Sequence, residues 1–339
     1  MNSKEIVAST IEFRNPKRLS YSVDIDVSYY ESVNAETALV LRKLLKNAPE
    51  DICRVWDDSI DYLGQEEYVD RWGVKWKQAK AEGHPLEAGW QLLDELRIPE
   101  PYPPGWREAA IEKKWASRDK YVLGHVWFTL FERLWFLRGF ENMLLDPYLY
   151  EDRFVFLRDK ILDYNLRKIS VLLELGVDGI FFSDDWGDQQ SLLMNPKDWR
   201  KYYKPCYKEM FDCVHMGGAH VWLHSCGNVL DIVPDLIEIG VNVLNPIQPQ
   251  AMDVHALGRR FGGKLCFYGG ADVQGTLPRG TAQDVEREVD CLVQALSRNG
   301  AGYIGGTSHT ILPDTPIENI EALFRAFNRY ADPDQHLMA

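Results

Sequence analysis

The sequence predicts an α/β protein folded as one (β/α)8 barrel, with helices and a hairpin added near the N-terminus. Two observations support this fold class. From about residue 120, short apolar runs alternate with amphipathic helical stretches, which is typical of parallel strands joined by right-handed crossovers. Nearly every apolar run also ends in small or polar residues, and in a closed barrel those ends surround a single cavity.

The expected elements follow in chain order. Six apolar runs in the second part of the chain are predicted strands, at residues 121–128, 179–183, 220–224, 241–248, 264–270 and 302–306. The helical patterns between and after them cover residues 151–175, 196–216, 229–239 and 282–298. The first part is less regular, with a predicted helix at 35–46, the first barrel strand at 51–56, a hairpin at 66–77 and an irregular cover at 85–104. Seven barrel strands are thus predicted, and an eighth is assumed.

The length of 339 residues suits one large barrel, which we expect to span residues 1–339, with 1–50 and 60–118 as N-terminal extension and cover. A hydrophobic content of 45% is enough for a complete core. The net charge of −13 argues against a nucleic-acid or anionic-membrane partner. The sequence shows no signal peptide, membrane span or disulfide spacing, so we expect a reduced cytoplasmic protein. It leaves the oligomeric state open, with a homodimer among the options.

A histidine and a cysteine, His224 and Cys226, stand one residue apart where an apolar run gives way to a Gly-Asn turn. Alternate residues of a strand project from the same face, so both side chains can reach one point. His309 ends the last predicted strand and would face the same cavity. Imidazole and thiolate are zinc ligands, and three protein ligands with one open position are typical of a catalytic zinc site. Each of the three has an ordinary alternative, as a core histidine, a packed cysteine or a loop histidine.

Three acids are candidate catalytic groups. Asp184 and Asp185 follow the strand predicted at 179–183 and could supply a fourth ligand or a general acid, or could cap the next helix. Glu132 lies among aromatic residues, where the pKa of a carboxyl can be raised. We give preference to an ion pair of Glu132 with Arg133 or Arg138. The residues expected to line the cavity are Trp127, Phe128, Trp135, Trp186, Gln190, Gln248 and Tyr268.

At these residues the chain resembles the uroporphyrinogen decarboxylase superfamily, which includes the corrinoid-dependent methyltransferases. The resemblance covers about residues 120–330 and rests on Gly-Val-Asp-Gly-Ile-Phe-Phe-Ser-Asp-Asp-Trp-Gly at 176–187, His-Ser-Cys-Gly-Asn at 224–228, Phe-Tyr-Gly-Gly at 267–270 and Pro-Asp-Thr-Pro at 313–316. It implies a (β/α)8 barrel. The arginine-rich N-terminal motif that binds the tetrapyrrole in true decarboxylases has no match here, so the resemblance is greater to the methyltransferases.

In the methyltransferase branch, a zinc ion is bound by His-x-Cys and by a later cysteine. His224 and Cys226 match the first two ligands, and His309 falls where the later cysteine is expected. One thiolate fewer gives a harder metal that suits an oxygen rather than a thiol. The resemblance therefore implies zinc, a methoxylated aromatic methyl donor and a partner protein that carries the corrinoid (cobalamin) acceptor, in an O-demethylation that yields methylcobalamin.

Other functions remain open from the sequence. They are methyl transfer from a methylcorrinoid to a thiol or another acceptor, a decarboxylase-like lyase or metal-dependent hydrolase on the same scaffold, and a barrel that binds a small aromatic ligand without catalysis. Zinc content separates the binding protein from the enzymes, and dependence on a corrinoid separates the methyltransferases from the lyase.

Overall fold

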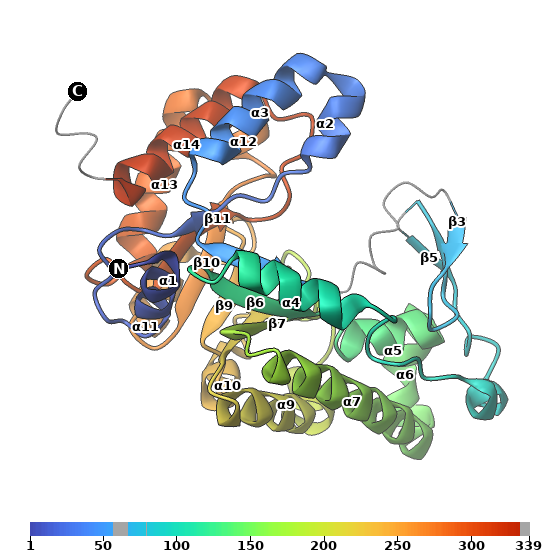
Figure 1. Ribbon diagram of the computed structural model, residues 1–339. Helices are drawn as coiled ribbons and strands as arrows, with labels where there is room; N and C mark the ends of the chain where they lie inside the picture. The colour runs from blue at the N-terminus through green and yellow to red at the C-terminus, as the bar shows by residue number, and fades with distance from the viewer. Residues whose placement is uncertain (57–66, 79, 333–339) are drawn as a thin grey trace.

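The computed structural model describes residues 1–56, 67–78 and 80–332 and has an eight-stranded parallel sheet at its centre (Figure 1). Strands neighbour one another in the order β1-β11-β10-β9-β8-β7-β6-β2, so the sheet curls into a nearly closed barrel surrounded by helices. This is the (β/α)8 fold that the sequence predicts. The barrel strands are β1 (Tyr21–Ser22), β2 (Ile52–Val55), β6 (Tyr121–Val126), β7 (Gly179–Ser183), β8 (His220–His224), β9 (Val243–Ile247), β10 (Cys266–Ala271) and β11 (Tyr303–Thr307).

The first barrel strand is β1, a two-residue strand whose Tyr21 and Ser22 pair with Gly305 and Gly306 of β11. The prediction that residues 51–56 form the first strand is therefore wrong, because β2 is the second. Two residues are too few to show an alternating pattern. Pairing with β11, rather than local sequence, places β1 in the barrel.

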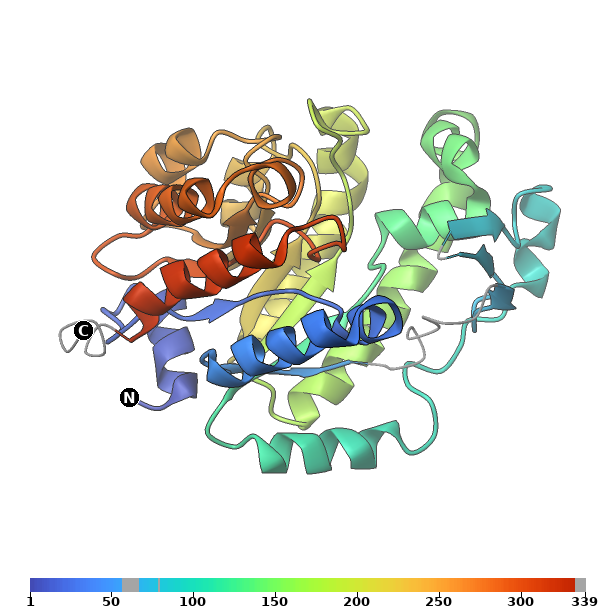
Figure 2. The same cartoon turned by 90° about the horizontal axis from the view of Figure 1, so that it is seen from above.

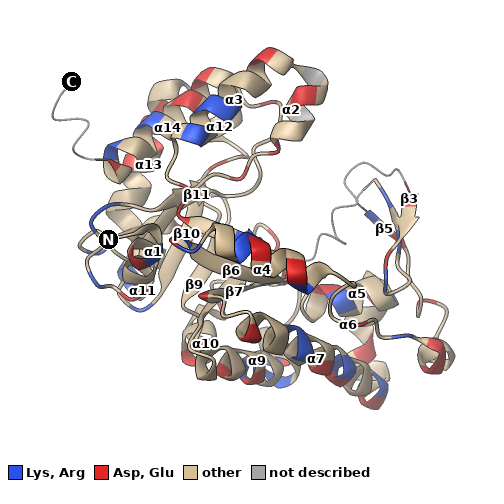
Figure 3. Ribbon diagram, viewed as in Figure 1, with Lys and Arg blue, Asp and Glu red and all other residues tan. Residues whose placement is uncertain are grey.

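The helices lie mainly on the outer face of the barrel (Figure 2). They are α1 (Ser3–Ile11), α2 (Val27–Val33), α3 (Ala35–Asn47), α4 (Trp106–Ala116), α5 (Phe131–Arg138), α6 (Phe140–Leu149), α7 (Glu151–Glu174), α8 (Pro196–Asp198), α9 (Lys204–Met216), α10 (Val233–Glu238), α11 (Val254–Phe261), α12 (Thr276–Arg279), α13 (Ala282–Leu296) and α14 (Ile317–Ala331), with a 3-10 helix at Trp90–Glu95 and a π-helical turn at Trp199–Tyr203. Charged residues gather on these helices, whereas β7 and β9 carry almost none (Figure 3). This distribution fits strands that are buried on both faces.

Two apolar clusters form the core. One fills the layer between the strands and the outer helices. The other lies inside the barrel and includes Val7 and Ile11 from α1, together with Phe181, Trp222 and Ile304 from the strands. Because α1 supplies two of these buried side chains, it packs against the barrel interior. None of the helices built from the described residues is both long and apolar enough to cross a membrane.

A small antiparallel sheet, β3 (Glu67–Val69), β4 (Lys75–Lys77) and β5 (Lys80–Gly83), stands outside the barrel beside α5 (Figure 1). It contains the hairpin predicted at 66–77, of which residue 66 lies outside the described residues, as do 60–65 and 79 of the predicted cover. The ring of Trp76 on β4 lies 5.9 Å from Phe128 and 4.9 Å from Phe136, measured between ring centroids. These contacts fix the small sheet to the segment that follows β6.

Candidate active site

A group of three side chains with metal-binding chemistry lies at the carboxyl ends of β7 and β8. Ser183 pairs with His224 in the sheet register, so Asp185, two residues beyond β7, lies beside the turn that follows β8. Each of Asp185, His224 and Cys226 offers one ligand atom, and these three atoms lie within 4.8 Å of one another. Within the described ranges, this is the one such group of histidine, cysteine and acidic side chains. We call these three residues the Asp-His-Cys cluster.

Neighbouring polar groups orient the cluster. Nδ1 of His224 lies 2.7 Å from Oδ1 of Asn245 on β9, which leaves Nε2 directed at the other two members. From Nε2, the distance is 3.5 Å to Oδ1 of Asp185 and 3.5 Å to Sγ of Cys226. The backbone N–H of Cys226 donates to Oδ1 of Asp185 at 2.8 Å. A hydrogen bond to the second ring nitrogen is the usual way in which proteins orient a metal-binding histidine.

Burial makes the Cys226 thiol hard to ionise when the protein binds no cation. Burial raises the pKa of Cys226 far above its usual value, and the nearby Asp185 and Glu132 carboxyls raise it further. A bound cation would reverse this effect, because it stabilises the thiolate directly. The thiol is therefore in a setting where deprotonation and metal binding are coupled.

Glu132, in the first turn of α5, is the acid beside this cluster that has a free oxygen atom. The residue is 7% exposed, and its Oε2 is buried with no hydrogen-bond partner in the described part of the chain. Burial raises the pKa of Glu132 well above its usual value, and the charges of Asp185 and Asp184 add to the effect. A buried polar atom without a partner is rare in native proteins and needs an explanation. Glu132 is close enough to Asp185 and Cys226 for its charge to affect the pKa values of the cluster.

The predicted ion pair of Glu132 with Arg133 or Arg138 is wrong. Arg133 pairs with Asp70 at 3.4 Å, and its guanidinium lies 4.8 Å from the centroid of Trp72. Arg138 pairs with Asp146 at 2.7 Å. The helix directs these two arginines away from Glu132 and toward acids on other segments.

Asp184 is a capping residue. Its carboxylate accepts the backbone N–H groups of Leu130, Phe131 and Glu132 at the start of α5, together with the hydroxyl of Tyr207. Burial raises the pKa of Asp184 to about 6, while these four hydrogen bonds favour the ionised form and oppose the rise. The helix that it caps precedes it in the chain, whereas the sequence suggested the following one. Since the carboxylate is fully engaged, Asp185 is the member of the pair available to the cluster.

A cavity of about 360 Å³ opens beside His224 at this end of the barrel. His309, the third ligand expected from the sequence, lines this cavity but is exposed and lies outside the Asp-His-Cys cluster. The structure thus brings His224 and Cys226 together with Asp185, and places His309 separately. The residues that line the cavity are Ser22, Val23, Asp24, Arg54, Trp56, His125, Trp127, Phe181, His224, Asn245, Pro246, Tyr268, Thr307, Ser308, His309 and Thr310.

Of the residues expected to line the cavity, the structure places Trp127 and Tyr268 there. The other five lie elsewhere. Trp186 is fully buried between Trp199 and Tyr207, and Gln248 accepts the backbone N–H of Gly227 at 2.5 Å, so it supports the turn that carries Cys226. Phe128 and Trp135 pack against Phe136, and Gln190 is exposed in a turn.

Sequence reasoning missed Arg54, Trp56, His125, Phe181 and Asn245 on the cavity wall. Four of them lie within strands rather than after them, namely Arg54, His125, Phe181 and Asn245. The alternation of inward and outward side chains along β2 and β6 was the available signal.

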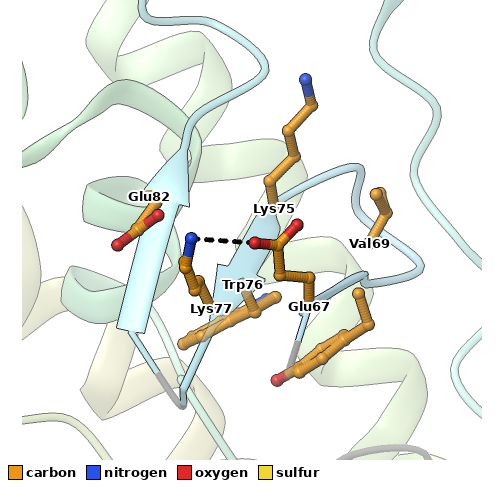
Figure 4. Close-up of a pocket in the computed structure, with 7 residues that line it drawn as sticks. Glu67, Val69, Lys75, Trp76, Lys77 and Glu82 are labelled. Carbon is orange, nitrogen blue, oxygen red and sulfur yellow. Dashed lines mark ion pairs between the residues drawn. The ribbon is translucent and has the colours of Figure 1, made fainter. Parts of the chain in front are cut away.

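A second hollow lies on the small outer sheet and is lined by Glu67, Tyr68, Val69, Lys75, Trp76, Lys77 and Glu82 (Figure 4). Lys77 and Glu67 pair across it at 2.9 Å, which lowers the pKa of the exposed Glu67 carboxyl. One lysine and one glutamate of this hollow thus neutralise each other. The barrel cavity, in contrast, is lined by His224 of the Asp-His-Cys cluster.

The fold and the site define a class of protein, a (β/α)8 barrel with a cluster of potential metal ligands at the carboxyl ends of its strands. Barrel enzymes have their active sites at this end. The family model for uroporphyrinogen decarboxylase (URO-D) matches residues 128–330. The chain belongs to this family.

Two curated relatives are uroporphyrinogen decarboxylases from two strains of Thermus thermophilus. Each is 27% identical over 173 residues, which are 48% of this chain and 45% of the relative. The match therefore spans about half the length of these relatives. Among solved structures, a methyltransferase from Methanosarcina mazei is similar with a TM-score of 0.69 and 17% identity, covering 97% of this chain and 99% of that one. At this identity the likeness shows a shared fold.

Proposed function

We propose that this protein is a zinc-dependent methyltransferase that moves a methyl group from a methoxylated aromatic compound to cob(I)alamin on a separate corrinoid protein. The main observation is the Asp-His-Cys cluster beside a cavity with aromatic walls. The resemblance of the chain to the corrinoid-dependent methyltransferases gives the reaction its class.

The donor set fits zinc. One thiol, one imidazole and one carboxylate converge within 4.8 Å, and Asn245 orients the imidazole. Zinc takes sulfur, nitrogen and oxygen ligands, and catalytic sites leave one position open for water or substrate. Asp185, His224 and Cys226 would hold the ion. When bound, zinc would act as a Lewis acid that polarises the ether oxygen of the substrate.

The residues around the cluster would perform the remaining tasks. The aromatic side chains of Trp127, Phe181 and Tyr268 line the cavity and would hold the ring of the substrate. The substrate loses its methyl group to the corrinoid acceptor, and its oxygen keeps the electron pair of the broken bond and takes a proton to become a phenol. Glu132 would supply this proton from Oε2, because Asp184 is engaged as a cap and Asp185 belongs to the cluster.

Decarboxylation of a porphyrinogen fits this cavity poorly. A tetrapyrrole with eight carboxylates needs several cationic partners and a large opening. The cavity measures about 360 Å³, and Arg54 is the one lysine or arginine among the described residues that line it. A single aromatic ring is a better match in both size and charge.

The test is zinc analysis of the purified protein, followed by an assay of methyl transfer from methoxylated aromatic compounds to cob(I)alamin. We expect about one zinc per chain and formation of methylcobalamin. Cys226→Ser should lose both. Cys291→Ser is the matched control, since Cys291 lies 3.4 Å from His255 on the outer helices, in a cysteine–histidine pair without a third ligand among the described residues.

Absence of zinc, even after zinc is supplied, would contradict the proposal and favour a ligand-binding barrel. Zinc together with turnover that needs no corrinoid would favour a lyase or hydrolase. Methyl transfer from methylcobalamin to a thiol, without any O-demethylation, would reverse the proposed direction.

A further inference from the structure

Arg54 is a cation on the inner face of the barrel, far along the chain from the cluster. It lies on β2, where alternate residues point inward, and it lines the same cavity as His224. Its Nη2 donates to the hydroxyl of Tyr268 at 2.8 Å. The guanidinium carbon lies 6.0 Å from the ring centroid of Phe181 and 5.9 Å from that of Tyr268. Two aromatic rings thus lie beside the cation.

No acid balances the charge of Arg54 among the described residues. Its one hydrogen bond within the described residues is to the hydroxyl of Tyr268, and those residues place no carboxylate oxygen within 4.0 Å of it. Asp24 lines the same cavity, but its carboxylate accepts the Thr310 hydroxyl at 2.7 Å. A guanidinium has five N–H donors and stays charged, so four donors of Arg54 are left for other partners. Arg54 is half-buried, and a charge that is partly removed from water is stabilised by a counter-charge.

His125 adds a second unused polar group to the same wall. It lies on β6, which pairs directly with β2, and its side chain is 1% exposed. Neither of its ring nitrogens has a hydrogen-bond partner among the described residues. The imidazole stacks 4.8 Å from Phe181 and 5.3 Å from Trp127. Burial lowers the pKa of His125 well below its usual value, and the charge of Arg54 lowers it further, so a neutral ring presents one N–H donor.

We infer that Arg54 and His125 form a subsite for a carboxylate, so that the methyl donor is a methoxylated aromatic acid. The carboxylate would bind the guanidinium fork and the imidazole N–H, with the ring between Trp127, Phe181 and Tyr268. His224 lines the same cavity and marks where the methoxy group would lie. This inference rests on the proposed function and adds the charge of the substrate to it.

The experiment compares two nearly isosteric ligands, 4-methoxybenzoate and 4-methoxybenzamide, by calorimetric titration of the zinc-loaded protein at pH 7.5. The 3-methoxy isomers are measured in parallel. We expect the acid to bind roughly 10- to 100-fold more tightly than the amide, as for hydrogen bonds between charged groups. Arg54→Met should abolish this preference. Arg54→Lys should keep a smaller one, because an ammonium lacks the planar fork.

Arg260→Met is the matched control. Arg260 is exposed on α11 with its guanidinium 4.8 Å from the ring of Phe261, so it is also an arginine against an aromatic ring, but outside the barrel. It should bind as the wild type does. His125→Phe keeps the ring stacking and should weaken binding of the acid roughly 3- to 10-fold, with little effect on the amide.

Equal affinity for acid and amide in the wild type would overturn the inference, and so would the absence of binding by both. This comparison does not depend on any variant being folded. It also does not depend on turnover. Preferential binding of the acid without methyl transfer to cob(I)alamin would leave the subsite standing and remove the proposed function. Methyl transfer from neutral methoxylated compounds, with no preference for acids, would support the proposed function and overturn the carboxylate subsite.

Discussion

Asp184 and Glu132 are joined by a hydrogen bond of 2.7 Å, in which the backbone N–H of Glu132 donates to Oδ1 of Asp184. The bond connects the end of β7 to the first turn of α5. The residue next to Asp184 belongs to the Asp-His-Cys cluster, and the side chain of Glu132 has the free oxygen beside that cluster. One buried carboxylate therefore fixes the position of the cluster relative to the proposed acid.

Replacement of Asp184 by Asn should destabilise the protein and also lower activity. An amide has one oxygen to accept hydrogen bonds, whereas the carboxylate uses two. At least one of the three N–H groups at the start of α5 would therefore lose its partner. A lost helix cap costs about 0.5–2 kcal/mol, and an unsatisfied buried donor about 1–3 kcal/mol. The free energy of unfolding, measured by urea denaturation, should fall by roughly these amounts.

The control for this change is Asp188→Asn. Asp188 caps an exposed turn by accepting the N–H groups of Gln190 and Ser191 at 2.7 and 2.8 Å. Its loss should cost well under about 1 kcal/mol, because exposed donors can bond to water. Equal losses for the two variants would contradict the special role of Asp184.

Glu132→Gln tests whether the free oxygen acts as an acid or as a metal ligand. The change removes the transferable proton and keeps the size of the side chain. We expect kcat for methyl transfer to fall about 10²- to 10⁴-fold, with zinc content unchanged. Zinc analysis and steady-state kinetics on the same preparation give both quantities. Loss of zinc along with activity would instead make Glu132 a ligand.

Asn245→Ala should weaken zinc binding without removing any ligand. Asn245 orients the His224 ring through a contact of 2.7 Å, and loss of such an orienting partner usually costs roughly 10- to 100-fold in metal affinity. Competition with a chromogenic chelator measures the change. Asn142→Ala on α6, whose side chain donates to the Arg138 carbonyl at 3.0 Å, should leave zinc affinity unaltered. A similar zinc affinity in both variants would show that His224 needs no such support.

The pH dependence of stability should reflect Glu288 on α13. Burial raises the pKa of Glu288 to about 7, although it accepts hydrogen bonds from Asp272 N–H and the Thr276 hydroxyl. The folded protein therefore keeps this proton to a higher pH than the unfolded chain does. Between about pH 4.5 and 7 the folded state binds more protons, so the free energy of unfolding falls as pH rises. A shift of this size corresponds to at most about 3 kcal/mol.

Glu288→Gln should remove this contribution. The melting temperature of the wild type should drop more between pH 5 and pH 8 than that of the variant. The exposed Glu318 on α14 offers a control, since Glu318→Gln should change with pH as the wild type does. A wild-type and a Glu288→Gln curve that run parallel would rule out Glu288 as a source of pH dependence.

The strands after residue 120 could be predicted because each is a short apolar run flanked by helical periodicity. β1 could not, since its two residues become a strand only through pairing with β11. At the site, the different roles of the adjacent Asp184 and Asp185 could not be predicted either. Sequence alone cannot tell that Asp184 turns toward α5 and Asp185 toward Cys226, because the distinction depends on where α5 begins. Arg54 could not be identified from the residues that follow the strands, because it lies within β2.

His309 provides the sharpest comparison between the sequence and the structure. Its place in the chain makes it the expected third ligand, whereas the structure brings Asp185 to His224 and Cys226. If the structural cluster is the zinc site, Asp185→Asn should lose most of the bound zinc. His309→Ala should keep zinc within a few-fold of the wild type, because an exposed side chain on the cavity wall would be removed. Zinc per chain, measured by plasma mass spectrometry after dialysis against a weak chelator, compares the two variants directly.

The opposite pattern of zinc content would make His309, rather than Asp185, the third ligand. Zinc lost in His309→Ala and kept in Asp185→Asn would require the segment after β11 to move His309 toward the cluster when the metal binds. His309→Cys then separates the two ligand sets further. A cysteine at this position should leave zinc affinity unchanged if residue 309 is not a ligand. If it is one, the added thiolate should make the metal softer and shift activity from O-methyl donors toward thiol acceptors.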